Sequence, residues 1–264
     1  MSRTTAIPYP GPKIHELPLE EGVPTQAEIE AYPPLHTWND LKGLVKSGHL
    51  HEIGRAKQLS DRYNAWRTTI AATYGSPENY LIKVRLPFKP IDIGRPSDID
   101  ASTYLRYDPI KGFDTDLYAI LPNSWPYAIP HDVRHYCIWS RIPIVPPHLV
   151  HDDPLAWAKI QHDGLGGFTG VNPAAVDEAL KDEWTGVQYE AKHGHEMAKM
   201  VRALWDERGW ECLWFINPPR LQSIPGLYHS HVLARRKSPE EIKASEQQFK
   251  QIPTDDQNAN GVDK

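Results

Sequence analysis

WECLWFIN (residues 210–217), PPRLQSIPGL (218–227) and YHSHVLA (228–234) form the stretch that decides the fold. The first and third segments are rich in aromatic and β-branched residues, which are typical of strands. The segment between them contains prolines and a glycine, so it cannot continue either strand and predicts a connection. The sequence therefore predicts two strands near the carboxyl end of the folded part of the chain.

Hydrophobic spacing upstream of this stretch predicts the remaining elements. Thr37 followed by Asp40 resembles a capping box at the start of a helix, which Gly48 ends. A second helix ends at Gly75, and a long third helix begins at Pro173 after an asparagine. Helices are thus expected at 38–47, 59–74 and 173–208, further strands at 80–86, 117–121 and 135–142, and a flexible glycine-rich loop at 164–170.

This order of elements predicts an α+β fold, with helices first and then an antiparallel sheet crossed by a long helix. The single domain is expected to span residues 35–236. Residues 1–34 are rich in proline and predict an extended arm, either wrapped on the domain or loose. Residues 237–264 form a polar tail, expected to be mostly disordered, in which Pro239 could start a short helix.

Composition narrows the class of protein. The chain has 264 residues and a formal net charge of −5, which argues against nucleic acid as the main partner. Mean hydropathy is −0.56, and no apolar run approaches the ~18 residues of a spanning helix, so no membrane segment is expected. The two cysteines, Cys137 and Cys212, exclude a disulfide scaffold and suit a reducing compartment. We expect a soluble, cytoplasmic protein.

The strongest candidate for chemistry is the histidine pair at 229 and 231. Residues two apart in a strand point to the same face, so both imidazoles are expected to share one site. Such a pair can supply a nucleophile that attacks phosphorus, because histidine titrates near neutrality. It can also supply half of a metal site, or be two surface histidines. The sequence alone leaves these alternatives open.

The connection before this pair carries groups that suit an anion. Arg220, Gln222 and Ser223 can donate hydrogen bonds, as can exposed backbone amides in a turn that contains proline and glycine. Earlier in the chain, Trp125 adjoins Asn123 and can form an aromatic wall of a ligand pocket. These residues predict a site for a phosphorylated ligand.

Five segments of the chain resemble a fungal family named after N-acetylglucosamine-induced protein 1. The resemblance covers nearly the whole body, from residue 32 to about 235. The name of that family records induction, and its members are poorly characterised. The segments are YPPLHTWNDL (32–41), YGSPENYL (74–81), LPNSWPY (121–127), RHYCIWS (134–140) and WFINPPRLQSIPGLYHSHVLAR (214–235).

The order of motifs is also similar to that of the histidine-triad superfamily of nucleotide hydrolases and nucleotidyl transferases. The matching order is Asn-x-x-Pro-Tyr (123–127), a histidine opening a strand, a long helix, a strand ending in asparagine, Gln-Ser, and a final His-x-His strand. The resemblance implies a nucleotide or another phosphorylated small molecule as partner. We expect no cofactor, with a metal held by His229 and His231 as the alternative. It implies these roles: His229 as nucleophile, His231 as the last triad histidine, Gln222 and Ser223 as phosphate donors, and Asn123 and Asn217 in nucleotide contacts. We expect Tyr127, in the same motif as Asn123, to be a further substrate-binding residue.

The chain departs from the triad pattern at its first histidine, where Leu227 stands. Leucine can neither hydrogen bond nor carry charge, so the nucleophile would lack one partner. His135 is expected nearby and could compensate. Three alternatives therefore remain: a hydrolase or transferase acting through His229, a non-catalytic binding protein on the same fold, and a metal-dependent enzyme that uses His229, His231 and another histidine. The oligomeric state stays open, a homodimer included.

Overall fold

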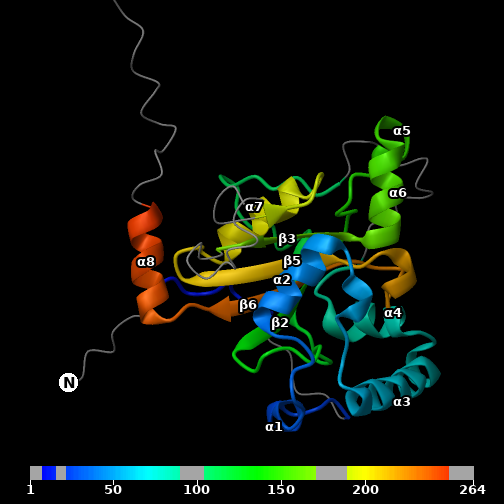
Figure 1. Cartoon of the computed structure of the whole chain (residues 1–264). Helices are drawn as coiled ribbons and strands as arrows, with labels where there is room; N and C mark the ends of the chain where they lie inside the picture. Colours follow the sequence, from blue (N-terminus) through cyan, green and yellow to red (C-terminus); the bar gives the residue numbers. More distant parts are fainter. Residues whose placement is uncertain (1–7, 16–21, 90–103, 171–188, 250–264) are drawn as a thin grey trace, which may run out of the picture.

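The structure is a computed structural model that describes residues 8–15, 22–89, 104–170 and 189–249. It has an α+β fold in which helices surround one six-stranded antiparallel sheet (Figure 1). The strands follow the order β1-β2-β6-β5-β3-β4 across the sheet. Their bounds are β1 Tyr118–Pro122, β2 Val133–Ser140, β3 Leu165–Thr169, β4 Tyr189–Glu190, β5 Trp210–Ile216 and β6 Tyr228–Arg236. The predicted fold class and the four strands expected around 117–121, 135–142, 210–217 and 228–234 are confirmed.

The two faces of the sheet pack against different helices. Helix α7 (His195–Leu204) contributes to the larger core on one face, where Met197 and Val201 share a buried cluster with Trp214 of β5. Helix α2 (Trp38–Ser47) covers the other face, where Leu41 clusters with Phe215. Because neighbouring residues of a strand point to opposite faces, one strand supplies both cores.

The face covered by α2 also carries the histidines. Cys137 pairs with His231 and Trp139 pairs with His229 across β2 and β6, while Phe215 of β5 lies opposite His231. These pairs project their side chains to one side of the sheet. The histidine face therefore holds the polar side chains of His229 and His231 between two apolar clusters, one around Leu41 and the other around Leu227.

A helical segment after α2 closes over this face. Helix α3 (Lys57–Tyr74) is followed by α4 (Pro77–Tyr80) and by the π-helical turn η2 (Leu81–Arg85). The strand predicted at 80–86 is therefore wrong. Ser76 accepts a hydrogen bond from Asn79 and Pro77 occupies the first turn, so a new helix begins there and its apolar residues pack on the cluster around Leu227.

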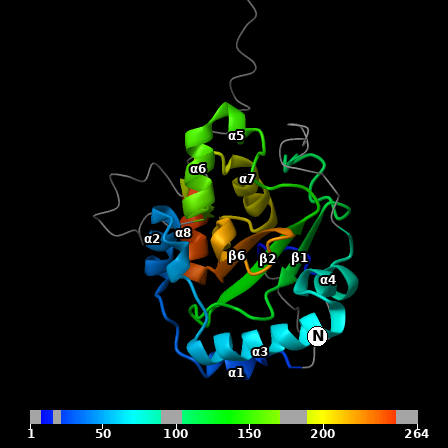
Figure 2. The same ribbon diagram turned by 90° about the vertical axis from the view of Figure 1, so that its right-hand side faces the viewer.

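Several local predictions are confirmed. Thr37 and Asp40 form the predicted capping box of α2, and Gly48 ends that helix with φ of 76°. Helix α3 ends at Gly75 as expected. The remaining elements are α1 Gln26–Glu30, η1 Leu50–Glu52, α5 Leu149–Asp152, α6 Pro154–Asp163, η6 Pro219–Leu221 and α8 Pro239–Phe249. Helix α1 lies beside α3, joined by an Arg62–Glu28 ion pair of 2.9 Å (Figure 2).

Two predictions about the middle of the chain need correction. The segment at 164–170, expected to be a flexible loop, contains β3, because its glycines let strands and the Trp214 ring approach closely. The structure describes only residues 189–208 of the segment predicted as a long helix at 173–208. These residues form β4 followed by α7, so the prediction is wrong for them, and its first part lies outside the described residues. Gly194 caps α7, and His193 has a left-handed φ of 71°, so both precede the helix.

The described part of the amino-terminal arm is wrapped on the domain, and the prediction that the arm is extended is wrong for residues 26–30, which form α1 behind a capping box at Thr25. The indole nitrogen of Trp210 donates to the Tyr9 carbonyl at 2.9 Å, and the Tyr9 hydroxyl donates to Glu246 of α8 at 2.5 Å. The short helix predicted at Pro239 is confirmed as α8, whereas the rest of the predicted tail, 250–264, lies outside the described residues. Within the described ranges, no helix combines the length and apolar character that crossing a bilayer requires.

Gly167 offers a test of the close packing around β3. A Cβ atom at Gly167 would lie 2.6 Å from the Tyr189 carbonyl oxygen and 2.8 Å from the Trp214 ring. We therefore expect Gly167→Ala to lower the free energy of unfolding by about 1–3 kcal/mol, because neither neighbour can move without disturbing the sheet. Urea unfolding measures the change.

The matched control is Gly43→Ala, in the interior of α2, where an added Cβ meets nothing within 4 Å. This change should raise stability by up to about 1 kcal/mol, because alanine favours helix. If both variants shift stability in the same direction, the packing argument for Gly167 fails.

Candidate functional site

A pocket lies between the histidine face of the sheet and the segment α3–α4–η2; we call it the first pocket. It offers about 90 Å³ to water-sized groups, several times what one water molecule needs. The lining combines aromatic rings, two arginines, hydroxyls and the two histidines of β6. Its residues include Arg55, Tyr63, Trp66, Tyr80, Arg85, Asn123, Ser124, Trp125, Cys137, Trp139, Ser223, Ile224, His229 and His231.

His229 is held in one defined tautomer. Its Nδ1 lies 2.9 Å from the Leu227 carbonyl oxygen, which can only accept, so Nδ1 carries the proton and Nε2 carries the lone pair. No described residue makes a hydrogen bond to Nε2. The ring is buried and stacks on Trp139 with centroids 4.6 Å apart. Burial lowers the pKa of His229, an effect that the hydrogen bond to Leu227 partly offsets, so the ring is neutral near pH 7.

His231 belongs instead to a buried relay with His135. The backbone N–H of Tyr127 donates to Nδ1 of His135 at 3.2 Å, so the neutral His135 ring carries its proton on Nε2. That proton is donated to Nδ1 of His231 at 2.9 Å. Nε2 of His231 then faces the Tyr127 hydroxyl oxygen at 3.4 Å. Nδ2 of Asn217, an amide donor, also lies 3.2 Å from Nε2 of His231, so these contacts do not fix the tautomer of that ring.

Desolvation keeps both rings of this relay neutral. Burial lowers the pKa of His135 and of His231 well below the usual range of histidine, and the positive charge of Arg55 lowers both further. Two charged imidazoles at this distance would repel each other in a medium of low dielectric. The relay is therefore a set of neutral donors and acceptors, and it is not a pair of charged groups.

Two asparagines support the relay from opposite sides. Asn123 accepts from the backbone N–H of Trp125 at 2.9 Å, and its Nδ2 lies 3.2 Å from Nε2 of His135. The side-chain Nδ2 of Asn217 donates to the Tyr127 hydroxyl at 3.2 Å. The predicted residues Asn123, Tyr127 and Asn217 thus contact the histidines, and of the three only Asn123 lines the first pocket.

The ligand atoms of His135, Cys137 and His231 lie within 4.8 Å of one another, a combination seen at metal centres. A metal on Nε2 of His135 would force the proton onto Nδ1, where it would face the Tyr127 N–H donor to donor at 3.2 Å. Without a metal ion, burial raises the pKa of the Cys137 thiol to about 12. The three side chains form a buried hydrogen-bonded cluster, which does not include His229.

Two arginines give the first pocket its charge. The side chain of Arg55 donates to the Trp125 carbonyl at 2.8 Å and stacks over Tyr63 with 4.1 Å to the ring centroid. Arg85, buried in η2, donates to the Ser124 hydroxyl at 3.1 Å. Sequence reasoning missed both arginines, because they come from segments without a recognised motif.

Aromatic residues form the opposite wall. Trp66 and Tyr63 of α3 each lie with ring centroids 5.5 Å from Trp125, and Tyr80 of α4 lies 5.5 Å from Trp66. The indole N–H of Trp125 is buried and has no hydrogen-bond partner among the described residues. An unpaired buried donor beside a pocket is costly unless a ligand or water accepts from it. Trp125 thus lines the first pocket, and its contact with a ligand stays a prediction.

The structure places the three predicted anion donors, Ser223, Gln222 and Arg220, in different surroundings. Ser223 lines the first pocket, together with His229 and His231. Gln222 does not line it; it donates to the Asn217 carbonyl at 2.8 Å and lines a neighbouring pocket that also includes His229. Arg220 lines neither pocket, because its guanidinium reaches the exposed His162 carbonyl at 3.1 Å. The structure thus places the Arg220 side chain away from the two pockets, and its part in ligand binding stays a prediction.

Comparison with known proteins gives distant relatives. N-acetylglucosamine-induced protein 1 of Candida albicans is 23% identical over 218 residues, which cover 81% of this chain and 73% of that protein. An uncharacterized protein of Saccharomyces cerevisiae is 23% identical over 213 residues, 79% of this chain and 85% of the relative. The crystal structure of HTC1 aligns with a TM-score of 0.42 and 22% identity, over 81% of this chain and 94% of that one.

A family profile also matches. It is described as a protein of unknown function (DUF3605), and it matches residues 37–160, from the start of α2 to α6. The expected resemblance to the fungal proteins is thus supported at low identity, and none of these names refers to a histidine-triad protein. The chain is similar to N-acetylglucosamine-induced protein 1 and to DUF3605, neither of which carries a stated activity.

Proposed function

We propose that the chain is a hydrolase or transferase that acts on a nucleotide or another phosphorylated small molecule through His229. The observation that carries this proposal is the state of that ring: Nδ1–H is held by the Leu227 carbonyl, and Nε2 has no hydrogen-bond partner among the described residues beside a pocket with two arginines. A neutral imidazole whose free nitrogen borders an anion site is poised for nucleophilic attack. The resemblance to the histidine-triad superfamily points to the same residue.

The reaction would proceed in two displacements. The Nε2 lone pair of His229 forms a bond to phosphorus while the P–O bond to the leaving group breaks, and the departing oxygen takes a proton from water. In the second step a water molecule, or an acceptor alcohol, attacks the phosphorus and breaks the P–N bond. The attacking oxygen loses its proton to solvent, and the neutral imidazole is restored. The covalent intermediate divides one slow displacement into two.

The surrounding groups suit the charge that this reaction develops. Arg55 and Arg85 place positive charge at the pocket, and the hydroxyls of Ser124 and Ser223 add donors to phosphoryl oxygens. The Leu227 carbonyl accepts from Nδ1–H and would stabilise the imidazole as it gains positive charge during attack. The backbone of residue 227 thus orients the nucleophile although its side chain is not a histidine.

The aromatic wall favours a ligand with a planar ring. Trp66, Trp125 and Tyr63 offer faces and edges on which a base can stack, and the unpaired indole N–H of Trp125 can donate to it. A nucleoside phosphate combines a planar base with an anionic group, as this lining does. The proposed partner is therefore a nucleotide, in an enzyme of the cytoplasm.

The test is to trap the covalent intermediate. The purified chain is incubated with nucleoside triphosphates, sugar nucleotides and aryl esters of nucleoside monophosphates, quenched in alkali and digested. We expect mass spectrometry to find one nucleoside monophosphate on the peptide that contains His229. Binding of nucleotides without an adduct, in rapid-quench samples as well, would overturn the catalytic proposal and favour the non-catalytic binding protein.

A further inference from the structure

The guanidinium of Arg55 lies among residues that line the first pocket. Its Nε donates to the Trp125 carbonyl at 2.8 Å, and its central carbon lies 4.1 Å from the centroid of the Tyr63 ring. Trp125 and Tyr63 both line that pocket. The positive charge also acts on two further lining residues: it adds to the effect of burial in lowering the pKa of His231, and it partly offsets the effect of burial on the pKa of Cys137.

The outer part of this guanidinium is free for a ligand. Its Nε is engaged by the Trp125 carbonyl, and one face of its plane lies on Tyr63. The two amino groups, Nη1 and Nη2, make no hydrogen bond to any residue within the described ranges. Because the planar group is held at one nitrogen and on one face, its two amino groups form a fork of fixed orientation.

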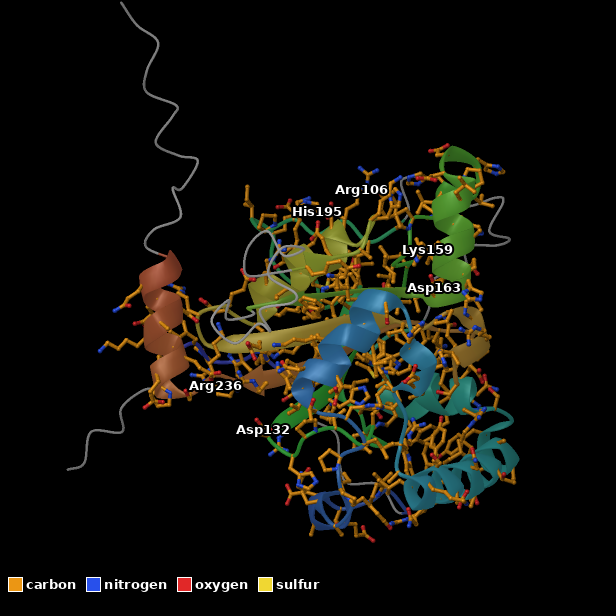
Figure 3. All side chains as sticks on the ribbon, viewed as in Figure 1. Arg106, Asp132, Lys159, Asp163, His195 and Arg236 are labelled. Carbon is orange, nitrogen blue, oxygen red and sulfur yellow. The ribbon has the colours of Figure 1, made fainter. Side chains whose placement is uncertain are left out.

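The charge of Arg55 has no counter-ion in the part of the chain that the structure describes. No aspartate or glutamate of that part lines the first pocket. By contrast, Arg202 and Arg235, which are half-buried like Arg55, each have two glutamate partners. Even the exposed Lys159 forms an ion pair of 2.6 Å with Asp163 on α6, where Figure 3 labels both. A half-buried charge without a partner is costly, so this position suits an anion from outside the chain.

The second arginine of the first pocket is held differently. Arg85 is buried in η2, and one of its amino groups donates to the Ser124 hydroxyl at 3.1 Å. Ser124 directly precedes Trp125, whose carbonyl holds Arg55. Arg85 thus uses an amino group to fix the turn that carries this carbonyl, whereas both amino groups of Arg55 are free of described partners.

We propose that Arg55 binds the phosphate of the ligand directly, with Nη1–H and Nη2–H donating to two of its free oxygens, while Arg85 acts by holding Ser124. This inference rests on the proposed function, which supplies the phosphorylated ligand. Two parallel hydrogen bonds from a planar fork select an anion with at least two free oxygens on one atom, such as the phosphate of a nucleoside monophosphate. An ammonium group has the same charge and no fork, so lysine cannot replace arginine here.

The experiment compares nucleoside monophosphates with the matching nucleosides, which lack only the phosphate. Isothermal titration calorimetry measures Kd for the adenosine, guanosine, cytidine and uridine compounds in the wild type, in Arg55→Lys and in Arg67→Lys. Arg67 is the matched control, because its guanidinium also packs on Tyr63, 5.7 Å from the ring centroid, yet it does not line the first pocket.

We expect Arg55→Lys to raise the Kd of the monophosphate about 10–100-fold, because one charge-assisted hydrogen bond is lost. The Kd of the nucleoside should change by less than about threefold, since the nucleoside has no group for the fork. Arg67→Lys should leave both values unchanged. Arg55→Gln, a second variant that guards against misfolding of the first, removes the charge as well and should weaken binding of the monophosphate further.

Two results would overturn the inference and leave the adduct on His229 intact. If Arg55→Lys binds the monophosphate as tightly as the wild type, charge alone matters and the fork is not used. If the monophosphate and the nucleoside lose affinity equally, Arg55 has a structural role only. If the wild type binds none of the four monophosphates and forms no adduct, the proposed function itself fails, and the inference fails with it.

Discussion

Replacing His229 with alanine is expected to abolish the nucleotidyl adduct and to lower turnover by at least about 10³-fold. The reason is that Nε2 of this ring is the nucleophile, and no described residue offers another free imidazole nitrogen to the first pocket: His231 has both ring nitrogens engaged with His135 and Tyr127. Water attacking the substrate directly would be the only remaining route. Single-turnover kinetics with a radiolabelled nucleotide measures both quantities.

A control variant and a chemical rescue with free imidazole test whether the loss of activity is specific to His229. His49→Ala removes an exposed imidazole far along the chain from the site and should leave turnover unchanged. Because His229→Ala leaves a ring-sized space beside Trp139, free imidazole in the buffer should restore part of the activity. An adduct that survives in His229→Ala, or activity within tenfold of the wild type, would show that another group carries the chemistry.

The second large effect is a loss of stability in mild acid. His135, His229 and His231 all have a lowered pKa, chiefly because burial disfavours their charged forms. In the unfolded chain they titrate near pH 6.5, so below that pH the unfolded state binds protons that the folded state does not. Their stabilising contribution is therefore complete above about pH 6.5 and is lost as the pH falls toward their folded pKa.

The size of this effect follows from proton linkage. As the pH falls, each histidine that stays neutral in the folded state lowers the free energy of unfolding by up to about 1.4 kcal/mol per pH unit. Three such histidines therefore lower it by up to about 4 kcal/mol when the pH falls from about 7.5 to 5.5. Glu207, whose pKa burial raises, acts in the opposite direction and offsets part of one such contribution. Asp153, with a pKa lowered to about 2 by its bond to Lys192, titrates well below this range.

Urea unfolding at a series of pH values measures the slope, and a variant identifies its origin. In His135→Gln one buried titrating group is gone, so the slope between pH 6 and 5 should fall by roughly one third relative to the wild type. The comparison holds even if the variant is less stable at every pH, since it concerns the slope alone. A slope that is the same in both proteins would exclude the relay as the source of acid sensitivity.

Local patterns predicted a good part of the fold and of the site. Thr37 and Asp40 form a capping box because they are three residues apart in the chain, wherever the helix packs. His229 and His231 share a face because residues two apart in a strand do so. Such relations depend on covalent spacing, and the sequence contains them in full.

Other features depend on which distant segments meet. The segment at 80–86 has the composition of a strand, yet it forms η2, because Ser76 and Pro77 start a helix whose apolar side chains pack against the sheet. The glycine-rich β3 owes its conformation to the Trp214 ring pressed against Gly167. In each case packing energy outweighs local preference.

The sequence by itself determined the antiparallel sheet, the pair of histidines on one face and the polar turn before them, because neighbouring residues have a geometry set by the backbone. Only the tertiary structure decided that Arg55 and Arg85 reach that pair, that His135 bonds to His231, and that His229 borders two pockets. These residues are far apart along the chain, and they meet because burying the apolar faces of α3, α4 and the sheet brings their elements together.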